Sequence, residues 1–263
     1  MNKYTHNINA IFTIAFRDIT KLLRDKGRIF GGLIFPIIFI GVLGTSLQSN
    51  LESSLQYNFL TFVFIGVIAQ TLFQSTAGGI ISLVEDRQND FAQEIFISPI
   101  SRYSIILGKI LGETLVSFVQ VIGVLIFGFI FGIPLSIIGL AKLLPFAILI
   151  ALFGGSFGLI VMSKMNSQRS ANQIFPFLLF PQFFLAGVFN PIKILPLPLE
   201  IATKIAPMTY AVDLMRSIYY TGSSEYDHVV LFNPWLNFVV CAGLTALFIG
   251  LGTYWFVKSE RER

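Results

Sequence analysis

The sequence predicts an all-α integral membrane protein with six transmembrane helices, and three observations support this fold class. Charged residues make up 12% and hydrophobic residues 54% of the 263 residues, whereas soluble proteins carry about 25% charged residues. The mean hydropathy is +0.76. Six windows longer than 20 residues contain no Asp, Glu, Lys, Arg or His, namely 29–51, 53–84, 114–141, 143–163, 170–192 and 229–257.

Each window is long enough to cross a membrane, because about 20 apolar helical residues span a hydrocarbon layer of about 30 Å. Backbone polar groups must find partners within their own segment there, so the windows should be helices. We therefore expect one transmembrane domain over residues 1–263, with an outer loop at 191–228. The predicted spans are about 29–50, 57–83, 106–132, 143–163, 171–190 and 229–257.

The distribution of Lys and Arg predicts the orientation. With the N-terminus in the cytoplasm, four of the 18 Lys and Arg residues lie on the outer side and the other 14 on the cytoplasmic side. Cytoplasmic connections of membrane proteins collect these residues, so we expect both termini in the cytoplasm. The same asymmetry accounts for the net charge of +4 without a nucleic-acid partner.

Residues 8–24 are too polar to span a membrane but form an amphipathic helix. Their apolar residues recur at steps of three and four, which gives one continuous helical face. Arg17, Asp18, Lys21 and Arg24 fall on the other side. We expect an interfacial helix at the headgroup boundary; the alternative is a helix packed on protein.

The connection between the second and third spans predicts a short cytoplasmic helix. Asp90 can cap its start, and the helix must end near Ile97 because Ser98 precedes Pro99. It carries Phe91, Ile95 and Phe96 among charged residues. These side chains either rest against lipid headgroups or insert into a groove on a soluble partner, and periodicity leaves both alternatives open.

The outer loop predicts two further helical pieces, because four prolines divide it into segments at about 199–205 and 208–220. Both pieces are apolar but too short to cross, which is typical of re-entrant or interfacial helices. Asp213 and Arg216 are three residues apart, so we expect them to pair on the exposed side of the second piece.

Several kinds of chemistry are missing from the sequence. No predicted span has a charged residue at its centre, where proton relays and ion sites usually need one. Gly108-Lys109 is followed by Ile110 and has Tyr103 where a P-loop needs its first glycine. His6 and His228 fall on opposite sides of the membrane, so no shared metal site is expected. We predict a chain that is not an enzyme and takes its energy from another subunit; the alternatives are a lipid-modifying membrane enzyme and a passive channel or scaffold.

Uncharged polar residues follow one face of three predicted spans. Gly66, Gln70, Gln74 and Gly78 recur every four residues in the second span. Amides in lipid often fasten helices together, and they can instead line an amphipathic path. The candidate path residues are Gln70, Gln74, Ser117, Gln120, Gln173, Phe177 and Gln182.

The chain resembles the permease subunits of ABC-2-type ATP-binding-cassette exporters, the daunorubicin-resistance-like transmembrane family. Two stretches carry the resemblance. The first runs from Glu85-Asp86-Arg87 through Gln93-Glu94 and Ser98-Pro99-Ile100-Ser101-Arg102 to Gly108-Lys109. The second runs from Phe184 to Phe189 and on through Pro191, Pro196 and Pro207-Met208-Thr209-Tyr210-Ala211-Val212-Asp213 to Arg216.

The resemblance implies that the 91–97 helix is a coupling helix seated in a separate cytoplasmic ABC ATPase, which binds ATP and Mg²⁺. The implied coupling residues are Glu85, Asp86, Arg87, Phe91, Glu94, Ile95, Phe96, Ser98, Pro99 and Arg102. The 199–220 pieces would be re-entrant helices that close the exit, with Pro207, Tyr210, Asp213 and Arg216 as an outer gate.

The resemblance further implies an assembly and a location. Two permease copies, or this chain and a homologous permease, would pair in a bacterial-type cytoplasmic membrane. The complex would export a drug, antibiotic, lipid or lipid-linked molecule by alternating access. A polysaccharide or lipid-linked glycan export permease of the same superfamily is the alternative.

Overall fold

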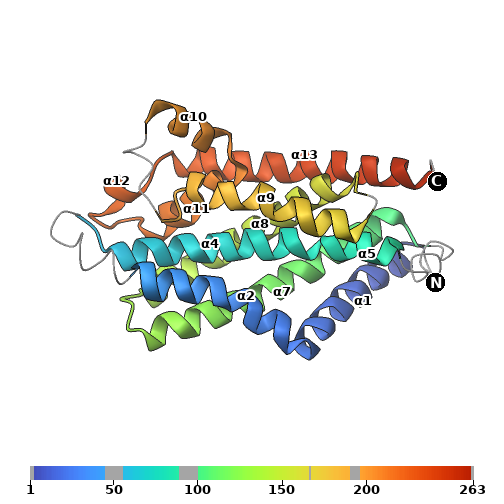
Figure 1. Cartoon of the computed structure of the whole chain (residues 1–263), viewed down its shortest axis with the longest axis horizontal. Helices are drawn as coiled ribbons and strands as arrows, with labels where there is room; N and C mark the ends of the chain where they lie inside the picture. Colours follow the sequence, from blue (N-terminus) through green and yellow to red (C-terminus); the bar gives the residue numbers. More distant parts are fainter. Residues whose placement is uncertain (1–2, 45–55, 89–99, 166, 190–195, 262–263) are drawn as a thin grey trace.

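The computed structural model describes residues 3–44, 56–88, 100–165, 167–189 and 196–261. All regular structure within these ranges is helical, and most helices run along one long axis (Figure 1). The start of α1 and the end of α13 lie at the same end of the bundle, and α10 and α12 lie at the other. The helices are α1 (Lys3–Arg24), α2 (Lys26–Ile38), the π-helix η1 (Phe39–Gly44), α4 (Phe59–Gly79), α5 (Ile81–Gln88), α7 (Arg102–Ile130), α8 (Ile137–Met162), α9 (Gln168–Leu185), α10 (Leu197–Ile205), α11 (Pro207–Tyr219), α12 (Tyr226–Val229) and α13 (Pro234–Arg261).

Four helical stretches of the described chain are long and apolar enough to cross a membrane. They are Phe59–Asp86, Arg102–Ile130, Ile137–Met162 and Pro234–Ser259. These correspond to the second, third, fourth and sixth predicted spans. The first and fifth predicted spans correspond to α2 with η1 and to the 18-residue α9, which contains Pro176 and Pro181. The count of six spans stays a prediction.

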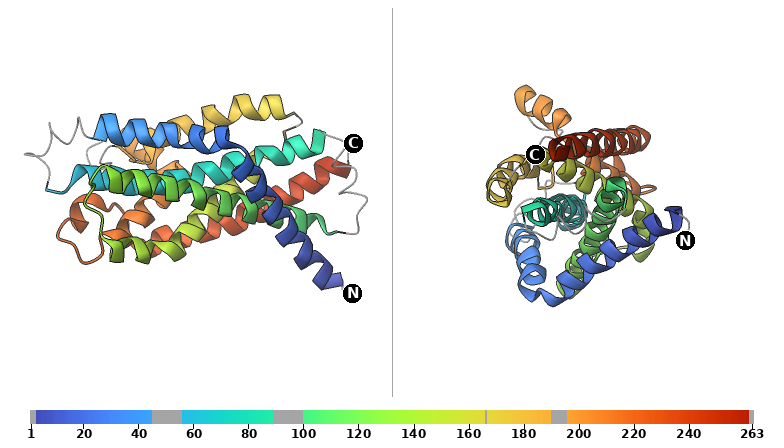
Figure 2. Two further views of the ribbon diagram at one scale, coloured as in Figure 1. Left: turned by 90° about the horizontal axis from the view of Figure 1, so that it is seen from below. Right: turned by 90° about the vertical axis from the view of Figure 1, so that its right-hand side faces the viewer.

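The central helix of the bundle is α4, which the end-on view shows surrounded by the other helices (Figure 2). Within its span, 83% of the most apolar window is buried inside the protein. Glycines of α8 allow a close approach: a Cβ at Gly154 would lie 2.2 Å from the Phe73 carbonyl oxygen, and one at Gly158 2.4 Å from that of Ala77. Any larger side chain at either position would push α8 away from α4.

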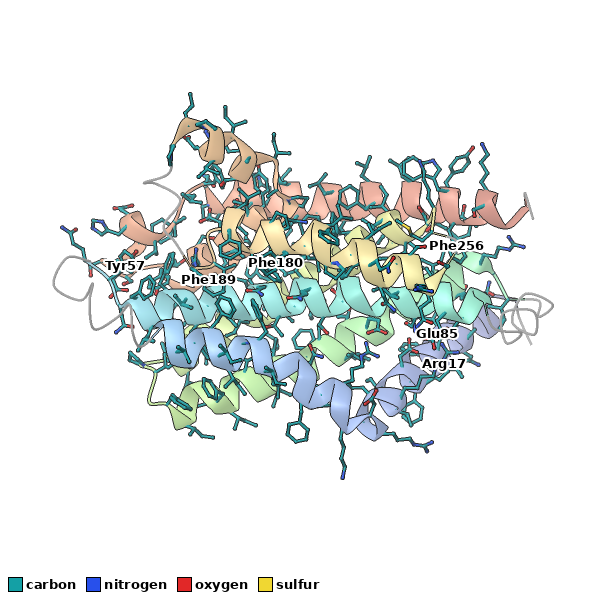
Figure 3. The ribbon with its side chains drawn as sticks, viewed as in Figure 1. Arg17, Tyr57, Glu85, Phe180, Phe189 and Phe256 are labelled. Carbon is teal, nitrogen blue, oxygen red and sulfur yellow. The ribbon has the colours of Figure 1, made fainter. Side chains whose placement is uncertain are left out.

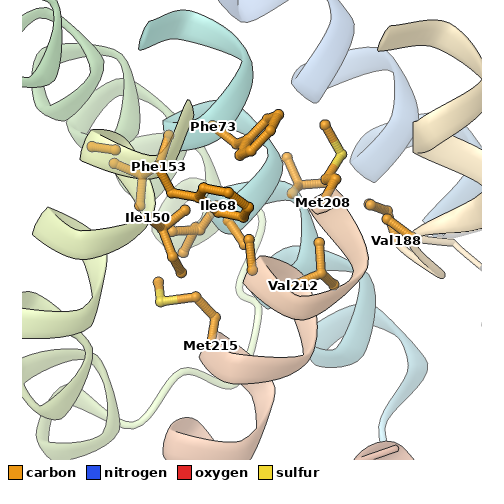
Figure 4. Packing of buried hydrophobic residues seen from close by; sticks show 14 of the residues in the cluster. Ile68, Phe73, Ile150, Phe153, Val188, Met208, Val212 and Met215 are labelled. Carbon is orange, nitrogen blue, oxygen red and sulfur yellow. The ribbon is translucent and has the colours of Figure 1, made fainter. Parts of the chain in front are cut away.

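The core between these helices is closed by α11, which is packed into the bundle. Figure 4 shows Ile68 and Phe73 of α4 against Ile150 and Phe153 of α8 and against Met208, Val212 and Met215 of α11. Between membrane-spanning helices, such a cluster is held together by close van der Waals packing and not by the removal of apolar surface from water. The helix α11 is therefore an integral part of the packed structure.

The helix α1 leaves the bundle at its N-terminal end and packs across α7 (Figure 2). The close contact needs two glycines, because a Cβ at Gly108 would lie 3.0 Å from the Ile11 carbonyl oxygen and one at Gly112 3.0 Å from the Ala15 Cα atom. The predicted continuous apolar face is divided: Ala15 is buried on α7, whereas Phe12 is exposed. The prediction that Asp18 is on the solvent side is wrong, since Asp18 is buried.

The predicted pairing of Asp213 with Arg216 on an exposed face is also wrong. Both side chains are buried, at 1% and 2% exposure, and they bind different partners. The reason is that α11 packs on α4, α8, α9 and α13, so that it has little exposed surface.

Candidate functional site

A cavity of about 460 Å³ lies among α2, α4, α5, α7 and α9. Its wall includes the amides of Gln70 and Gln74 from α4 and of Gln120 from α7. Arg28, in the first turn of α2, and Glu85, near the end of α5, also line the cavity. Its volume falls within the range of about 300–1,000 Å³ that is typical of small-molecule sites.

The amides of the cavity have spare hydrogen-bonding capacity. Gln70 Nε2 donates to Gln74 Oε1 at 3.4 Å, and the buried Gln70 Oε1 atom has no hydrogen-bond partner in the described part of the chain. Gln120 fits beside α2 because residue 32 is glycine, where a Cβ would lie 2.7 Å from Gln120 Nε2. An unpaired buried acceptor costs about 1–3 kcal/mol, so a ligand that donates a hydrogen bond would be favoured here.

The structure places the other four candidate path residues outside this wall. The Ser117 hydroxyl donates to the Thr114 carbonyl oxygen of its own helix at 2.7 Å. Gln182 Nε2 donates to the Leu178 carbonyl oxygen, and Gln182 Oε1 accepts from the Met208 N–H at 3.3 Å, so this amide fastens α9 to α11. Gln173 and Phe177 lie on the exposed face of α9, with Phe177 82% exposed.

A chain of ion pairs reaches the cavity at Arg28. Arg17 Nη2 lies 2.8 Å from Asp86 Oδ2 and 3.4 Å from Asp18 Oδ1. Lys109 Nζ lies 2.9 Å from Asp18 Oδ2 and 3.7 Å from Glu113 Oε1. Arg28 Nη2 completes the chain 2.8 Å from Glu113 Oε2. Figure 3 shows Arg17 and Glu85 at the same end of the bundle, opposite Tyr57.

The middle of this chain is buried. The side chains of Asp18, Lys109 and Glu113 are at most 2% exposed. The Glu113 carboxylate lies against the backbone of α4, because a Cβ at Gly79 would lie 1.9 Å from Glu113 Oε2. Ionised groups this deeply buried require partners, and each of the three has at least one oppositely charged neighbour.

The predicted coupling residues lie partly outside the described residues. Phe91, Glu94, Ile95, Phe96, Ser98 and Pro99 fall outside the described ranges, as does the side chain of Arg87. Glu85 and Asp86 occupy the end of α5, where Glu85 lines the cavity and Asp86 pairs with Arg17. Arg102 begins α7. The Ser101 N–H beside it donates to Asn7 Oδ1 at 3.3 Å, which joins the starts of α1 and α7.

At the opposite end of the bundle, Arg216 joins α11 to the end of α9. Its guanidinium donates to the carbonyl oxygens of Gly187 at 2.8 Å, Val188 at 3.0 Å and Phe62 at 3.2 Å. It also lies over the Phe62 ring, 3.5 Å from the centroid. Burial lowers the pKa of Arg216 to about 10, so the group remains cationic at neutral pH. Gly66 provides the space, because a Cβ there would lie 2.7 Å from Arg216 Nη2.

Asp213 binds the chain that leads into α13. Its carboxylate accepts from the Leu231 and Phe232 N–H groups at 2.8 and 2.9 Å and from Asn237 Nδ2 at 2.8 Å. Burial raises the pKa of Asp213, and these donors oppose that effect. Of the other two gate residues, Pro207 begins α11, and the Tyr210 hydroxyl donates to the Lys204 carbonyl oxygen at 2.8 Å. The four predicted gate residues therefore hold α11 in place.

Four long apolar helices of the described chain, with buried polar groups packed among them, define a helical membrane protein. The model of the family "ABC-2 type transporter" matches residues 9–220. The chain belongs to the ABC-2 type transporter family.

Individual relatives agree with this assignment. The chain is 24% identical over 221 residues to the protein named "Putative transport permease ycf38" of Cyanophora paradoxa. The aligned region covers 81% of this chain and 74% of that protein. It is 22% identical to the protein of the same name from Pyropia yezoensis, over 91% of this chain and 84% of that protein. A third match is the "Probable multidrug ABC transporter permease YbhR" of Escherichia coli strain K12, with 27% identity over 55% of this chain and 39% of that protein.

Proposed function

We propose that this chain is the transmembrane subunit of an ATP-driven exporter that moves an amphipathic molecule out of the cell. The cavity among α2, α4, α5, α7 and α9 is the observation that carries the proposal. Family membership implies a membrane location and an ABC ATPase partner. In the proposed complex that partner binds ATP and Mg²⁺ and contacts the cytoplasmic segment between α5 and α7.

The wall of the cavity favours an amphipathic substrate. Gln70, Gln74 and Gln120 offer hydrogen-bond donors and acceptors, while Phe35 and Phe175 offer apolar surface. Polar side chains outnumber apolar ones in this wall, so it would bind the polar part of an amphipathic molecule through hydrogen bonds and the apolar part through the two rings. A drug, antibiotic, lipid or lipid-linked molecule has both parts, whereas a small inorganic ion would need a fixed ring of charge or carbonyl groups.

The charged residues at the wall favour particular headgroups. Arg28 is neutralised by Glu113 at 2.8 Å, whereas no hydrogen bond or ion pair involves Glu85 within the described ranges. A cationic headgroup would therefore find an available carboxylate, and an anionic headgroup would have to displace Glu113 from Arg28. Neutral and cationic amphiphiles are the expected substrates.

A second permease copy would complete the path in this proposal. The exposed faces of α2 and α9 flank the cavity, and they present Ile34, Phe177 and Phe180. A homodimer would bring two such faces together, with both sets of termini in the cytoplasm. A homologous permease in place of the second copy would fit the same faces.

The proposal is tested by ligand-stimulated ATP hydrolysis. The permease is purified with the ABC ATPase that binds it, and neutral, cationic and anionic amphiphiles of equal chain length are added. We expect neutral and cationic amphiphiles to raise the hydrolysis rate and anionic ones to have the smallest effect. A Glu85→Gln variant should lose the response to cationic amphiphiles, whereas Glu200→Gln on the exposed α10 should keep it. No stimulation by any amphiphile would refute the proposed substrate class.

A further inference from the structure

Six side chains of alternating charge run continuously from α5 to the cavity. In order they are Asp86, Arg17, Asp18, Lys109, Glu113 and Arg28. We infer that this ion-pair chain consists of positioning residues that couple the ATPase-facing end of α5 to the wall of the cavity. The inference rests on the proposed function and assigns to these residues a role in transmission.

The ion-pair chain connects four helices, namely α5, α1, α7 and α2. Asp86 of α5 binds Arg17 of α1, Asp18 of α1 binds Lys109 of α7, and Glu113 of α7 binds Arg28 of α2. Asp86 precedes the proposed ATPase contact by only a few residues, whereas Arg28 lines the cavity. One end of the ion-pair chain therefore lies near the proposed ATPase contact, and the other end lies at the cavity wall.

The helices joined by the ion-pair chain are suited to move together. The glycine contacts at Gly108 and Gly112 hold α1 directly against α7, with no room for another Cβ. A single non-helical residue, Ile80, lies between α4 and α5, so the two form one almost continuous stretch up to Asp86. A displacement of α5 would pull Arg17 and hence α1, and α7 would follow with Glu113. Arg28 would then shift at the cavity wall.

Stability alone does not explain a buried chain of this kind. Replacing a buried ion pair by apolar residues of similar volume is often neutral or stabilising, whereas removing one partner is costly. The balanced variant Asp18→Asn with Lys109→Met therefore removes one charge of each sign and interrupts the chain in the middle. It leaves the Arg17–Asp86 and Arg28–Glu113 pairs intact.

The test uses a cysteine reporter in the cavity. Asn172 lines the cavity and is exposed, and the native Cys241 is buried, so Asn172→Cys gives a selective labelling site. Its reaction rate with a charged methanethiosulfonate reagent is measured in the complex with the ATPase, without nucleotide and with ATP and vanadate. The control variant, Glu200→Gln with Lys204→Met, removes an exposed ion pair of 2.7 Å on α10.

In the reporter complex we expect nucleotide to slow labelling by about 5–150-fold, the usual range of coupling between two sites. The control variant should keep this ratio. In the Asp18→Asn, Lys109→Met variant the ratio should approach unity while the ATPase still co-purifies. If that variant does not fold, Arg28→Gln with Glu113→Gln interrupts the chain at its other end and should give the same loss.

The possible outcomes separate the inference from the function on which it rests. An unchanged ratio in either interrupted variant overturns the inference alone. Labelling that ignores nucleotide even in the reporter complex overturns the proposed alternating access, and the inference with it.

Discussion

Replacing Arg216 by Met tests whether this side chain joins α11 to the end of α9. The substitution keeps an unbranched apolar stem, shorter than that of Arg, and removes every donor. The Gly187 and Val188 carbonyl oxygens would lose the Arg216 donors at 2.8 and 3.0 Å, and no other backbone donor to them is found within the described ranges. Each unsatisfied buried acceptor costs about 1–3 kcal/mol, so the free energy of unfolding should fall by about 2–6 kcal/mol.

Thermal unfolding of the purified permease in detergent measures this effect. A change of 1 kcal/mol shifts the Tm of a protein of this size by about 2–4 °C, so Arg216→Met should lower the Tm by at least about 4 °C. The matched control is Arg169→Met, which removes an exposed Arg at the start of α9. Exposed substitutions usually change stability by less than about 0.5 kcal/mol. Equal Tm values for the two variants would refute the assignment of Arg216 as the link between α9 and α11.

Three further predictions concern the Arg216 contact, the cavity and the proposed ATPase contact. Gly66→Ala should destabilise the protein by about 1–3 kcal/mol, because its Cβ would lie 2.7 Å from Arg216 Nη2, and a normal Tm would contradict this. Gln70→Leu should raise the half-saturating concentration of a polar-headed amphiphile about two- to tenfold, since one hydrogen bond contributes about 0.5–1.5 kcal/mol; unchanged saturation would remove Gln70 from the path. Phe91→Asp with Phe96→Asp should release the ATPase, and co-purification at the normal ratio would disprove that contact.

The sequence was most informative where a helix has a uniform environment. The second predicted span, 57–83, corresponds closely to α4 and the first residues of α5, because an uncharged apolar segment of this length among apolar neighbours forms a single helix. The sequence showed the stripe of polar and small residues on this span, but it did not show that these residues make two different kinds of contact. Gly66 accommodates Arg216, whereas Gln70 and Gln74 line the cavity, and the difference depends on helices distant in sequence.

Charged residues were the least predictable part of the candidate site. Asp18 looked like one of several polar residues on α1, because periodicity does not show which side of an amphipathic helix meets protein. A usable signal was present nearby: Lys109 and Glu113 are four residues apart on α7, beside Gly108 and Gly112. Small residues on an apolar helix indicate that another helix lies close by. Charged residues beside them indicate that this neighbouring helix carries charged partners.

The predicted pairing of Asp213 with Arg216 was wrong for a related reason. Three-residue spacing on a short helix predicts a surface ion pair, but the partners of these residues are backbone groups from the end of α9 and the approach to α13. Contacts of this kind depend on how α11 enters the bundle, which local patterns do not encode.

Transport in reconstituted vesicles tests the central claim most directly. The permease is placed in vesicles with and without its ABC ATPase, and the accumulation of a fluorescent neutral amphiphile is followed after ATP is added on the ATPase side. We expect accumulation against a gradient only when the ATPase and hydrolysable ATP are both present. Accumulation by the permease alone, or none by the complete complex with any amphiphile tested, would contradict it.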